Sequence, residues 1–218
     1  MKKAIIFDMD GTLFQTNFIL EPALEATFDV LRKKSLWQGV TPLEHYREIM
    51  GVSLPVVWQT LCPMHDEFTQ QESNVLFQHQ LIELIRQGKG ALYPNVEATL
   101  AKLAEHYPLY IASNGQTEYL QAIVETYKLE RYIQGVYSID MINSGHKSDL
   151  VKRVLEDNDI KRGAVVGDRL SDIRAAHDNG LVSIAVRFDF AQEAELQQAD
   201  MVIDDLQQLV TLSIAFDN

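Results

Sequence analysis

Five short apolar runs are spaced along the chain, and each ends at a small or an acidic residue. They lie at 4–7, 109–112, 164–167, 182–186 and 201–203. Because these runs are apolar without alternation, they predict strands that are buried on both faces of a sheet. Amphipathic segments between them predict helices over 95–107, 116–129, 147–158 and 171–180, the last opening with a Ser171 cap. Strands that alternate with helices predict an α/β fold with a Rossmann-like parallel sheet.

Residues 15–88 interrupt this alternation, and no convincing strand pattern appears among them. Helical patterns cover 41–51, 53–61 and 66–88. The first of them opens with Thr41, Pro42 and Glu44, a capping-box pattern with proline at the first helical position, and the last is closed by Gly88. We therefore expect an all-α block of residues 15–88, inserted into an α/β core that consists of 1–14 and 89–218.

Composition and charge restrict the partners that this chain can have. Of its 218 residues, 46% are hydrophobic and 23% are charged, which is typical of a globular protein with a buried core. Its net charge of −12 repels phosphate backbones and anionic lipid, so we expect neither nucleic acid nor membrane as a partner. The single cysteine, Cys62, excludes an internal disulfide, and no apolar run approaches the length of a spanning helix. These features predict a cytoplasmic protein, either a monomer or a homodimer.

Residues with chemical potential gather where the predicted strands end. Ligands bind at the carboxyl ends of the strands of an open parallel sheet, so these residues are expected to converge. They are Asp8 and Asp10 after the first strand, Ser113, Asn114 and Gly115 after the second, Lys147 at a helix start, and Asp168 and Asp172 after a later strand. The predicted pocket therefore holds up to four carboxylates, one lysine and one hydroxyl.

Four clustered carboxylates require a cation, and a site rich in hard oxygen ligands favours Mg²⁺. The cation would keep the acids ionised and would attract a phosphate dianion to an acidic protein. Lys147 would neutralise the remaining phosphoryl oxygens, while Ser113 and the backbone N–H groups of Asn114 and Gly115 would donate hydrogen bonds to them. The predicted ligand is thus a small phosphorylated metabolite.

The stretch FDMDGT at 7–12 then has a chemical interpretation. Asp8 would attack phosphorus and form an aspartyl-phosphate, and Asp10 would give a proton to the leaving oxygen and later take one from water. Acids at positions i and i+2 of an extended segment face the same side, so both can reach one phosphoryl group. Gly11 permits a sharp turn, and Thr12 can cap the site or hydrogen-bond within it.

These motifs in this order, DMDGT at 8–12, SNG at 113–115, a lysine opening a helix and GDRLSD at 167–172, resemble the haloacid dehalogenase-like hydrolases over nearly the whole chain. The resemblance implies that residues 15–88 are a small α-helical cap. It also implies Asp8 as nucleophile, Asp10 as general acid/base, Ser113 as the phosphate-binding hydroxyl and Lys147 as the charge stabiliser. Its Mg²⁺ ligands would be the carboxylates of Asp8, Asp168 and Asp172 and the backbone carbonyl of Asp10.

Departures from the family patterns narrow the branch. Dehalogenases and phosphonate-cleaving relatives lack the second acid of the first motif, which is present here as Asp10. The sugar-phosphate mutase branch often has arginine after GVS, where this chain has Leu54. The resemblance therefore favours the phosphatase branch, of the phosphoglycolate phosphatase or nucleotidase type. A mutase, and a binding or regulatory protein without useful turnover, stay open as alternatives.

Two of the assignments depend on the combined pattern. Taken singly, Lys147 is not distinguished from Lys152 on the same predicted helix. Asp172 alone is equally well explained as a first-turn acid that complements the helix dipole. The predicted enzyme is thus a Mg²⁺-dependent phosphoric monoester hydrolase whose substrate the sequence does not name.

Overall fold

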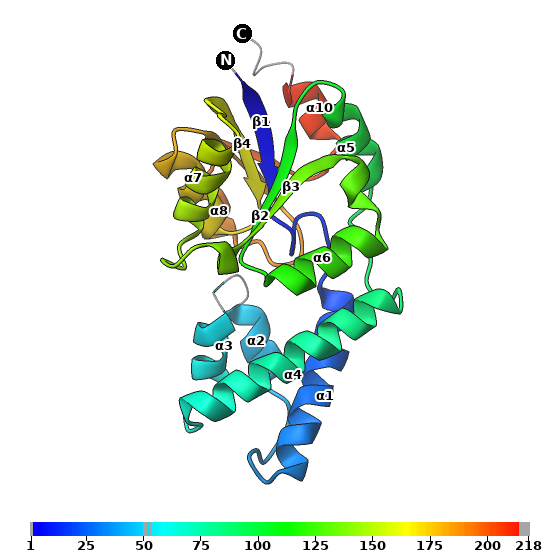
Figure 1. Ribbon diagram of the computed structural model, residues 1–218, viewed down its shortest axis with the longest axis vertical. Coiled ribbons are helices and arrows are strands. Elements are labelled where there is room, and N and C mark those ends of the chain that lie inside the picture. The colour runs from blue at the N-terminus through cyan, green and yellow to red at the C-terminus, as the bar shows by residue number, and fades with distance from the viewer. Residues whose placement is uncertain (1, 50–51, 53, 214–218) are drawn as a thin grey trace. The chain divides into compact units, whose positions relative to one another are not determined.

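Parallel strands form a six-stranded sheet in the computed structural model of the chain, which describes residues 2–49, 52 and 54–213 (Figure 1). The strand order is β3-β2-β1-β4-β5-β6. The strands are β1 (Lys3–Phe7), β2 (Leu109–Ser113), β3 (Ile133–Ser138), β4 (Arg162–Gly167), β5 (Val182–Val186) and β6 (Met201–Ile203). All five predicted strands are present, and the prediction of a Rossmann-like α/β fold is confirmed.

The strand β3 was missed by the pattern of apolar runs. It is an edge strand, and its central residues are only partly buried, so it does not read as a continuous apolar run. Gly135 interrupts it further. A Cβ at this position would lie 3.3 Å from Cδ1 of Tyr110 on β2, so the small residue lets the two strands approach each other.

Helices cover both faces of the sheet (Figure 1). Side chains of α7 and α8, including Leu150 and Ala176, form one core cluster with Ala4, Ile6 and Val165 of the central strands. The opposite alternate residues of β1 are equally buried, because helices also cover that side. The helices of this unit are α5 (Val96–Ala104), α6 (Thr117–Thr126), α7 (Lys147–Asp157), α8 (Leu170–Asp178), α9 (Glu193–Leu196) and α10 (Gln208–Ser213), with 3₁₀ turns at Leu129–Arg131 and Ile139–Met141.

The chain divides into two compact units, one formed by the residues up to Gln15 together with those from Leu92 onward, and the other by Thr16–Ala91. The chain leaves the first unit after Gln15 and re-enters it at Leu92, and these two places are held together. Phe14 forms an antiparallel bridge with Leu92, and the Gln15 amide donates to Leu92 O at 2.6 Å. The predicted boundaries lie one and three residues earlier, after residues 14 and 88. The function of the inserted unit as a cap stays a prediction.

The inserted unit is helical in the residues described, as α1 (Asn17–Lys33), α2 (Leu43–Glu48), α3 (Leu54–Leu61) and α4 (Glu67–Arg86). Its centre is aromatic: Trp58 lies edge-on to Phe77 and stacks on Phe28, with ring centroids 5.9 and 6.2 Å apart. Gly88 has a φ of +70° just after α4, which confirms it as the residue that closes this helix.

The predicted capping box of α2 is wrong. The helix begins at Leu43 with Pro42 as its N-cap, and no side chain caps it. Glu44 instead forms an ion pair with Arg47 at 2.5 Å, and Thr41 Oγ1 accepts hydrogen bonds from Arg32. The two arginines explain why the capping box does not form, because each of them pairs with one of the side chains that were predicted to cap the helix. Positions 50, 51 and 53, which include Gly51 and Ser53 of the GVSL stretch, lie outside the described residues.

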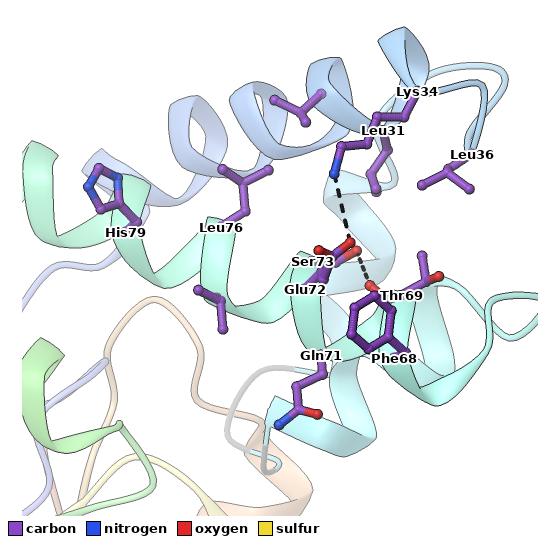
Figure 2. Close-up of a pocket in the computed structure, with 12 residues that line it drawn as sticks. Leu31, Lys34, Leu36, Phe68, Thr69, Gln71, Glu72, Ser73, Leu76 and His79 are labelled. Atoms are coloured by element: carbon purple, nitrogen blue, oxygen red, sulfur yellow. Dashed lines mark hydrogen bonds and ion pairs between the residues drawn. The ribbon is translucent and has the colours of Figure 1, made fainter.

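A pocket of about 510 Å³ lies along α1 and α4 of the helical unit (Figure 2). Apolar side chains such as Leu31, Leu36 and Leu76 line it, and Lys34 Nζ lies 3.7 Å from a carboxylate oxygen of Glu72 across it. Its lining is therefore mostly apolar, with one ion pair. Within the described ranges, no helix combines the length and the apolar character that crossing a bilayer requires.

Candidate active site

Asp8 directly follows β1 near the centre of the sheet. Its backbone N–H donates to Val166 O of β4 at 2.8 Å, so the strand pairing continues to this residue. The chain proceeds from β1 to β2 and β3 on one side and then returns to β4 on the other, so the strand order reverses between β1 and β4. Such a reversal opens a crevice at the carboxyl ends of the strands, where α/β sheets bind ligands. Asp8 is 6% exposed at this point.

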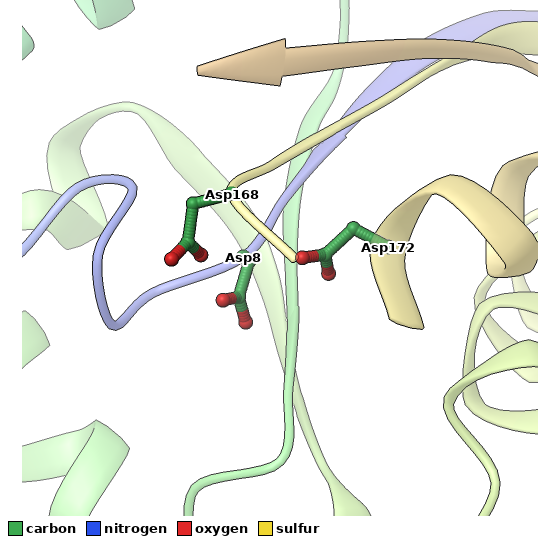
Figure 3. Close-up of side chains that lie close together, drawn as sticks. All are labelled: Asp8, Asp168 and Asp172. Atoms are coloured by element: carbon green, nitrogen blue, oxygen red, sulfur yellow. The ribbon is translucent and has the colours of Figure 1, made fainter. Parts of the chain in front are cut away.

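Three carboxylates converge beside that crevice. Asp168 follows β4, Asp172 belongs to the first turn of α8, and each offers an oxygen within 4.8 Å of the others and of an Asp8 oxygen. Figure 3 shows the three side chains directed toward one another from these separate elements. Asp168 and Asp172 are 1% and 2% exposed, so the cluster is nearly removed from solvent. The sequence-based expectation that these strand ends meet is therefore confirmed for Asp8, Asp168 and Asp172.

Lys147, the first residue of α7, provides the buried positive charge of this cluster. Its Nζ lies 2.6 Å from Asp8 Oδ1 and also pairs with Asp172. Lys152, its alternative in the sequence, is exposed and pairs with Glu156 on the same helix. The structure thus separates the two lysines that the sequence pattern alone did not.

Burial and the neighbouring charges together shift the pKa values of Asp168, Asp172 and Lys147. Burial raises the pKa of Asp168 well above its ordinary value, and the charges of Asp8 and Asp172 raise it further. Burial likewise raises the pKa of Asp172 to about 6, although Lys147 opposes this shift. Burial acts to lower the pKa of Lys147, but Asp172 and Asp8 outweigh it and the pKa is raised. Without a cation, three carboxylates and one ammonium group therefore leave an excess of negative charge.

Asp172 also shapes the loop that carries Asp168. Its Oδ2 accepts a hydrogen bond from the Arg169 backbone N–H at 3.1 Å and caps α8. The helix begins at Leu170 rather than at the predicted Ser171 cap, because this carboxylate, three residues into the helix, reaches back to its start. The carboxylate of Glu195 accepts from both the Leu170 N–H and Arg169 Nε at 2.9 Å and fixes the turn from outside. No sequence signal identified Glu195.

Gly11 and Thr12 hold the first loop against Asp168. Gly11 has a φ of +75°, and a Cβ there would lie 2.5 Å from Asp168 Oδ2, so both the backbone conformation and the space require glycine. Thr12 is fully buried, and its hydroxyl donates to Asp168 Oδ1 at 3.4 Å. These two residues therefore contact a carboxylate of the cluster; their predicted contact with phosphate stays a prediction.

The Asp10 carboxylate lies outside the group of three carboxylates. Its Oδ1 accepts a hydrogen bond from the hydroxyl of Tyr119, which lies in the first turn of α6. The predicted metal ligand at this position is the backbone carbonyl, and that assignment is untested. Tyr119 was missed, since a tyrosine on an amphipathic helix gives no sign of an acidic partner 109 residues earlier.

Ser113, Asn114 and Gly115 lie at the end of β2, which pairs with β1. Ser113 is 2% exposed, and its Oγ accepts from the Gly115 backbone N–H at 3.2 Å. The three residues therefore occupy the predicted edge of the sheet, and their role toward phosphate stays a prediction.

A further pair at this edge was not anticipated. Tyr93 donates its hydroxyl to Asp189 Oδ2 at 3.0 Å and stacks on Phe188 with the ring centroids 4.3 Å apart. Burial raises the pKa of Tyr93, and the negative charges of Asp189 and Asp168 raise it further. Phe188 and Asp189 belong to the loop after β5, so this loop contributes aromatic and acidic groups near the carboxylate cluster.

Curated proteins similar to this chain are phosphatases. A probable phosphatase, IndB, from Dickeya dadantii is 26% identical over 96% of this chain and 93% of its own length. A 5′-nucleotidase from Pseudomonas aeruginosa is 24% identical over 88% and 86%, and a phosphoglycolate phosphatase from Agrobacterium fabrum is 24% identical over 94% and 89%. These names agree with the prediction of a phosphoric monoester hydrolase.

The fold has close counterparts among solved structures. CbbY from Rhodobacter sphaeroides, solved in complex with phosphate, superposes with a TM-score of 0.81 at 20% identity and covers 96% of both chains. The family model of the haloacid dehalogenase-like hydrolases matches residues 5–186, which include the carboxylate cluster, Lys147 and the loops of Asp10 and Ser113. This chain therefore belongs to the haloacid dehalogenase-like hydrolase family.

Proposed function

We propose that this protein hydrolyses the phosphomonoester of a small metabolite through an aspartyl-phosphate on Asp8, with Mg²⁺ as its cofactor. The observation that carries the proposal is the buried group of Asp8, Asp168 and Asp172, with Lys147 Nζ 2.6 Å from Asp8 Oδ1 at the carboxyl edge of the sheet. A structural role alone would not favour three acids and one lysine in a buried place, because burying charges costs free energy.

The donor set fits a small hard cation. Three carboxylates provide oxygen atoms within 4.8 Å of one another, and the absence of a Cβ at Gly11 lets the Asp168 carboxylate lie directly against the first loop. Asp8, Asp168 and Asp172 would hold the ion, together with the backbone carbonyl of Asp10. When bound, Mg²⁺ would offset the excess negative charge and polarise a phosphoryl oxygen.

The reaction would then proceed in two balanced steps. An Asp8 carboxylate oxygen forms a bond to phosphorus while the bond to the leaving oxygen breaks, and Asp10 gives that oxygen a proton. Water next attacks the aspartyl-phosphate, gives a proton to Asp10, and releases inorganic phosphate and the free Asp8 carboxylate. Lys147 stabilises the charge on the phosphoryl oxygens in both steps, and Ser113, Asn114 and Gly115 donate hydrogen bonds to them.

The inserted helical unit would act as the cap that selects the leaving group and excludes water. Its position in the chain supports this role, because it begins at Thr16, five residues after Gly11, in the segment that follows the nucleophile loop. We further propose a cytoplasmic enzyme, monomeric or homodimeric, that acts without nucleic acid or membrane. The net charge of −12 supports the last point, since it disfavours polyanionic partners.

A panel of phosphorylated metabolites, assayed for phosphate release with Mg²⁺ and with EDTA, tests the proposal. It should include 2-phosphoglycolate and nucleoside monophosphates, on which similar proteins are named to act, as well as sugar phosphates and p-nitrophenyl phosphate. We expect Mg²⁺-dependent release that the Asp8→Asn variant lacks.

The matched control is Asp159→Asn, since Asp159 is an exposed acid in the same unit and pairs only at the surface with Lys161. Full activity in Asp8→Asn would refute the assignment of Asp8 as the nucleophile. Isomerised product without net phosphate release would indicate a mutase. Binding of a fluoroberyllate mimic without any turnover would indicate a binding protein.

A further inference from the structure

Tyr119 makes a direct hydrogen bond to the side chain proposed as the general acid/base. Its hydroxyl donates to Asp10 Oδ1 at a distance of 2.5 Å, and this bond joins α6 to the loop after β1. The tyrosine is 3% exposed, so water does not compete freely for this bond. The acceptor is the carboxylate of the partly buried Asp10, and a hydrogen bond to a carboxylate is shorter and stronger than one between neutral groups.

The surroundings of Tyr119 hold its ring in a defined place. A Cβ at Gly115 would lie 3.1 Å from Tyr119 Cδ1 and 2.9 Å from Leu120 Cδ2, so the small residue of the SNG motif makes room for this ring and its neighbour. The start of α6 is tied down as well, because Thr117 donates its N–H and its hydroxyl to the Asp140 carboxylate. The phenol is therefore a rigid donor rather than a mobile one.

We propose that Tyr119 is a positioning residue that fixes the carboxyl group of Asp10 for proton transfer; this inference rests on the proposed function. A carboxyl group can rotate about its bond to Cβ and can move its proton between two oxygens. With Oδ1 bound to a rigid phenol, that rotation is restrained, and the proton is given and taken at a constant place. Catalysis by a general acid depends on such placement, since proton transfer requires hydrogen-bond distance.

The consequence is a dependence on the leaving group. A phenolate leaves phosphorus less readily than p-nitrophenolate, whose charge is stabilised by the nitro group, so phenyl phosphate needs the proton from Asp10 more. Loss of the Tyr119 hydroxyl should therefore slow phenyl phosphate hydrolysis more than p-nitrophenyl phosphate hydrolysis. A general loss of structure would slow both esters equally.

The test compares kcat/KM of the full-length wild type and Tyr119→Phe with Mg²⁺ on these two esters, which are similar in size. We expect a fall of about 10- to 100-fold for phenyl phosphate, within the contribution of general acid catalysis, and a smaller fall for p-nitrophenyl phosphate. Tyr110→Phe is the matched control, because Tyr110 is a buried tyrosine of the same unit whose hydroxyl donates to Gln134 at 3.3 Å. It should change both values alike and by little.

A double-mutant cycle shows whether Tyr119 acts through Asp10. In an Asp10→Asn background, Tyr119→Phe should have almost no further effect on kcat/KM. Equal losses on both esters, or losses that multiply in the double variant, would overturn the inference while the hydrolase itself still works. Failure of the proposed function has a different signature: no phosphate release from the wild type, or unchanged release by Asp8→Asn.

Discussion

Replacement of Lys147 by methionine removes a buried cation that pairs with the cluster and leaves the three carboxylates in place. The methionine side chain has a similar length, so the change deletes charge more than volume. Lys147 is 6% exposed and lies 2.6 Å from Asp8 Oδ1. Removal of one partner of a buried ion pair costs about 3–5 kcal/mol, because the remaining charge stays buried without compensation. The Lys147→Met protein should therefore be strongly destabilised when metal is absent.

The expected loss is large enough to measure by thermal or urea unfolding in EDTA at pH 7.5. For a chain of 218 residues, each kcal/mol corresponds to a shift in Tm of about 2–4 °C, so a fall on the order of 10 °C is expected. An excess of Mg²⁺ should restore much of the loss, because the cation replaces the missing positive charge. Lowering the pH should restore part of it as well, since the raised pKa of Asp168 lets that group become neutral.

Lys152→Met is the matched control on the same helix. Its side chain is 63% exposed and its Nζ lies 3.9 Å from Glu156 Oε1, and such surface pairs contribute less than about 1 kcal/mol. The reasoning would be refuted if Lys147→Met unfolded within about 1 kcal/mol of the wild type in EDTA, the range expected for the control. That result would mean that the carboxylates are neutral or solvated in the free protein.

Three further predictions follow from the same cluster. In EDTA the wild type should become more stable as the pH falls from about 7 to about 5. Asp172, whose pKa is raised to about 6, takes up a proton in the folded state over this range while the same side chain in the unfolded protein stays ionised. Chemical unfolding at several pH values checks this, and a stability that rises with pH would contradict it. Mg²⁺ at 100 times its Kd should stabilise the protein by about 2.7 kcal/mol at pH 7.5 and should flatten that pH dependence. Unfolding midpoints measured in a Mg²⁺ titration check this, and midpoints that do not change with Mg²⁺ would count against the metal site. Gly11→Ala should abolish Mg²⁺-dependent phosphate release and should destabilise the protein more than Gly180→Ala. Both glycines have positive φ, but only a Cβ at Gly11 would collide with Asp168. Equal stability and activity in the two variants would show that the loop can rearrange to accept the Cβ.

The chain order of the motifs was sufficient to place the principal acids. An unbroken apolar run such as residues 4–7 predicts a strand buried on both faces, and parallel strands bring their carboxyl ends to one edge. Asp8 and Asp168 each come directly after such a run, so their proximity followed from topology alone. The closure of α4 at Gly88 was equally predictable, because it depends on the backbone freedom of glycine.

The pattern of apolar and polar residues did not predict which side chains of distant segments bond to each other. The choice of Lys147 over Lys152 depends on which turn of α7 faces Asp8, and the bond from Tyr119 to Asp10 depends on how α6 packs beside β3. Glu195 belongs to the four-residue helix α9, and Tyr93 and Asp189 belong to two loops. Segments this short carry no periodic signal. Local sequence specifies which faces are buried and where strands end, since those are properties of neighbouring residues. The partners of a buried charge are set by strand order and packing across more than a hundred residues, and these arise only when the whole sheet has formed.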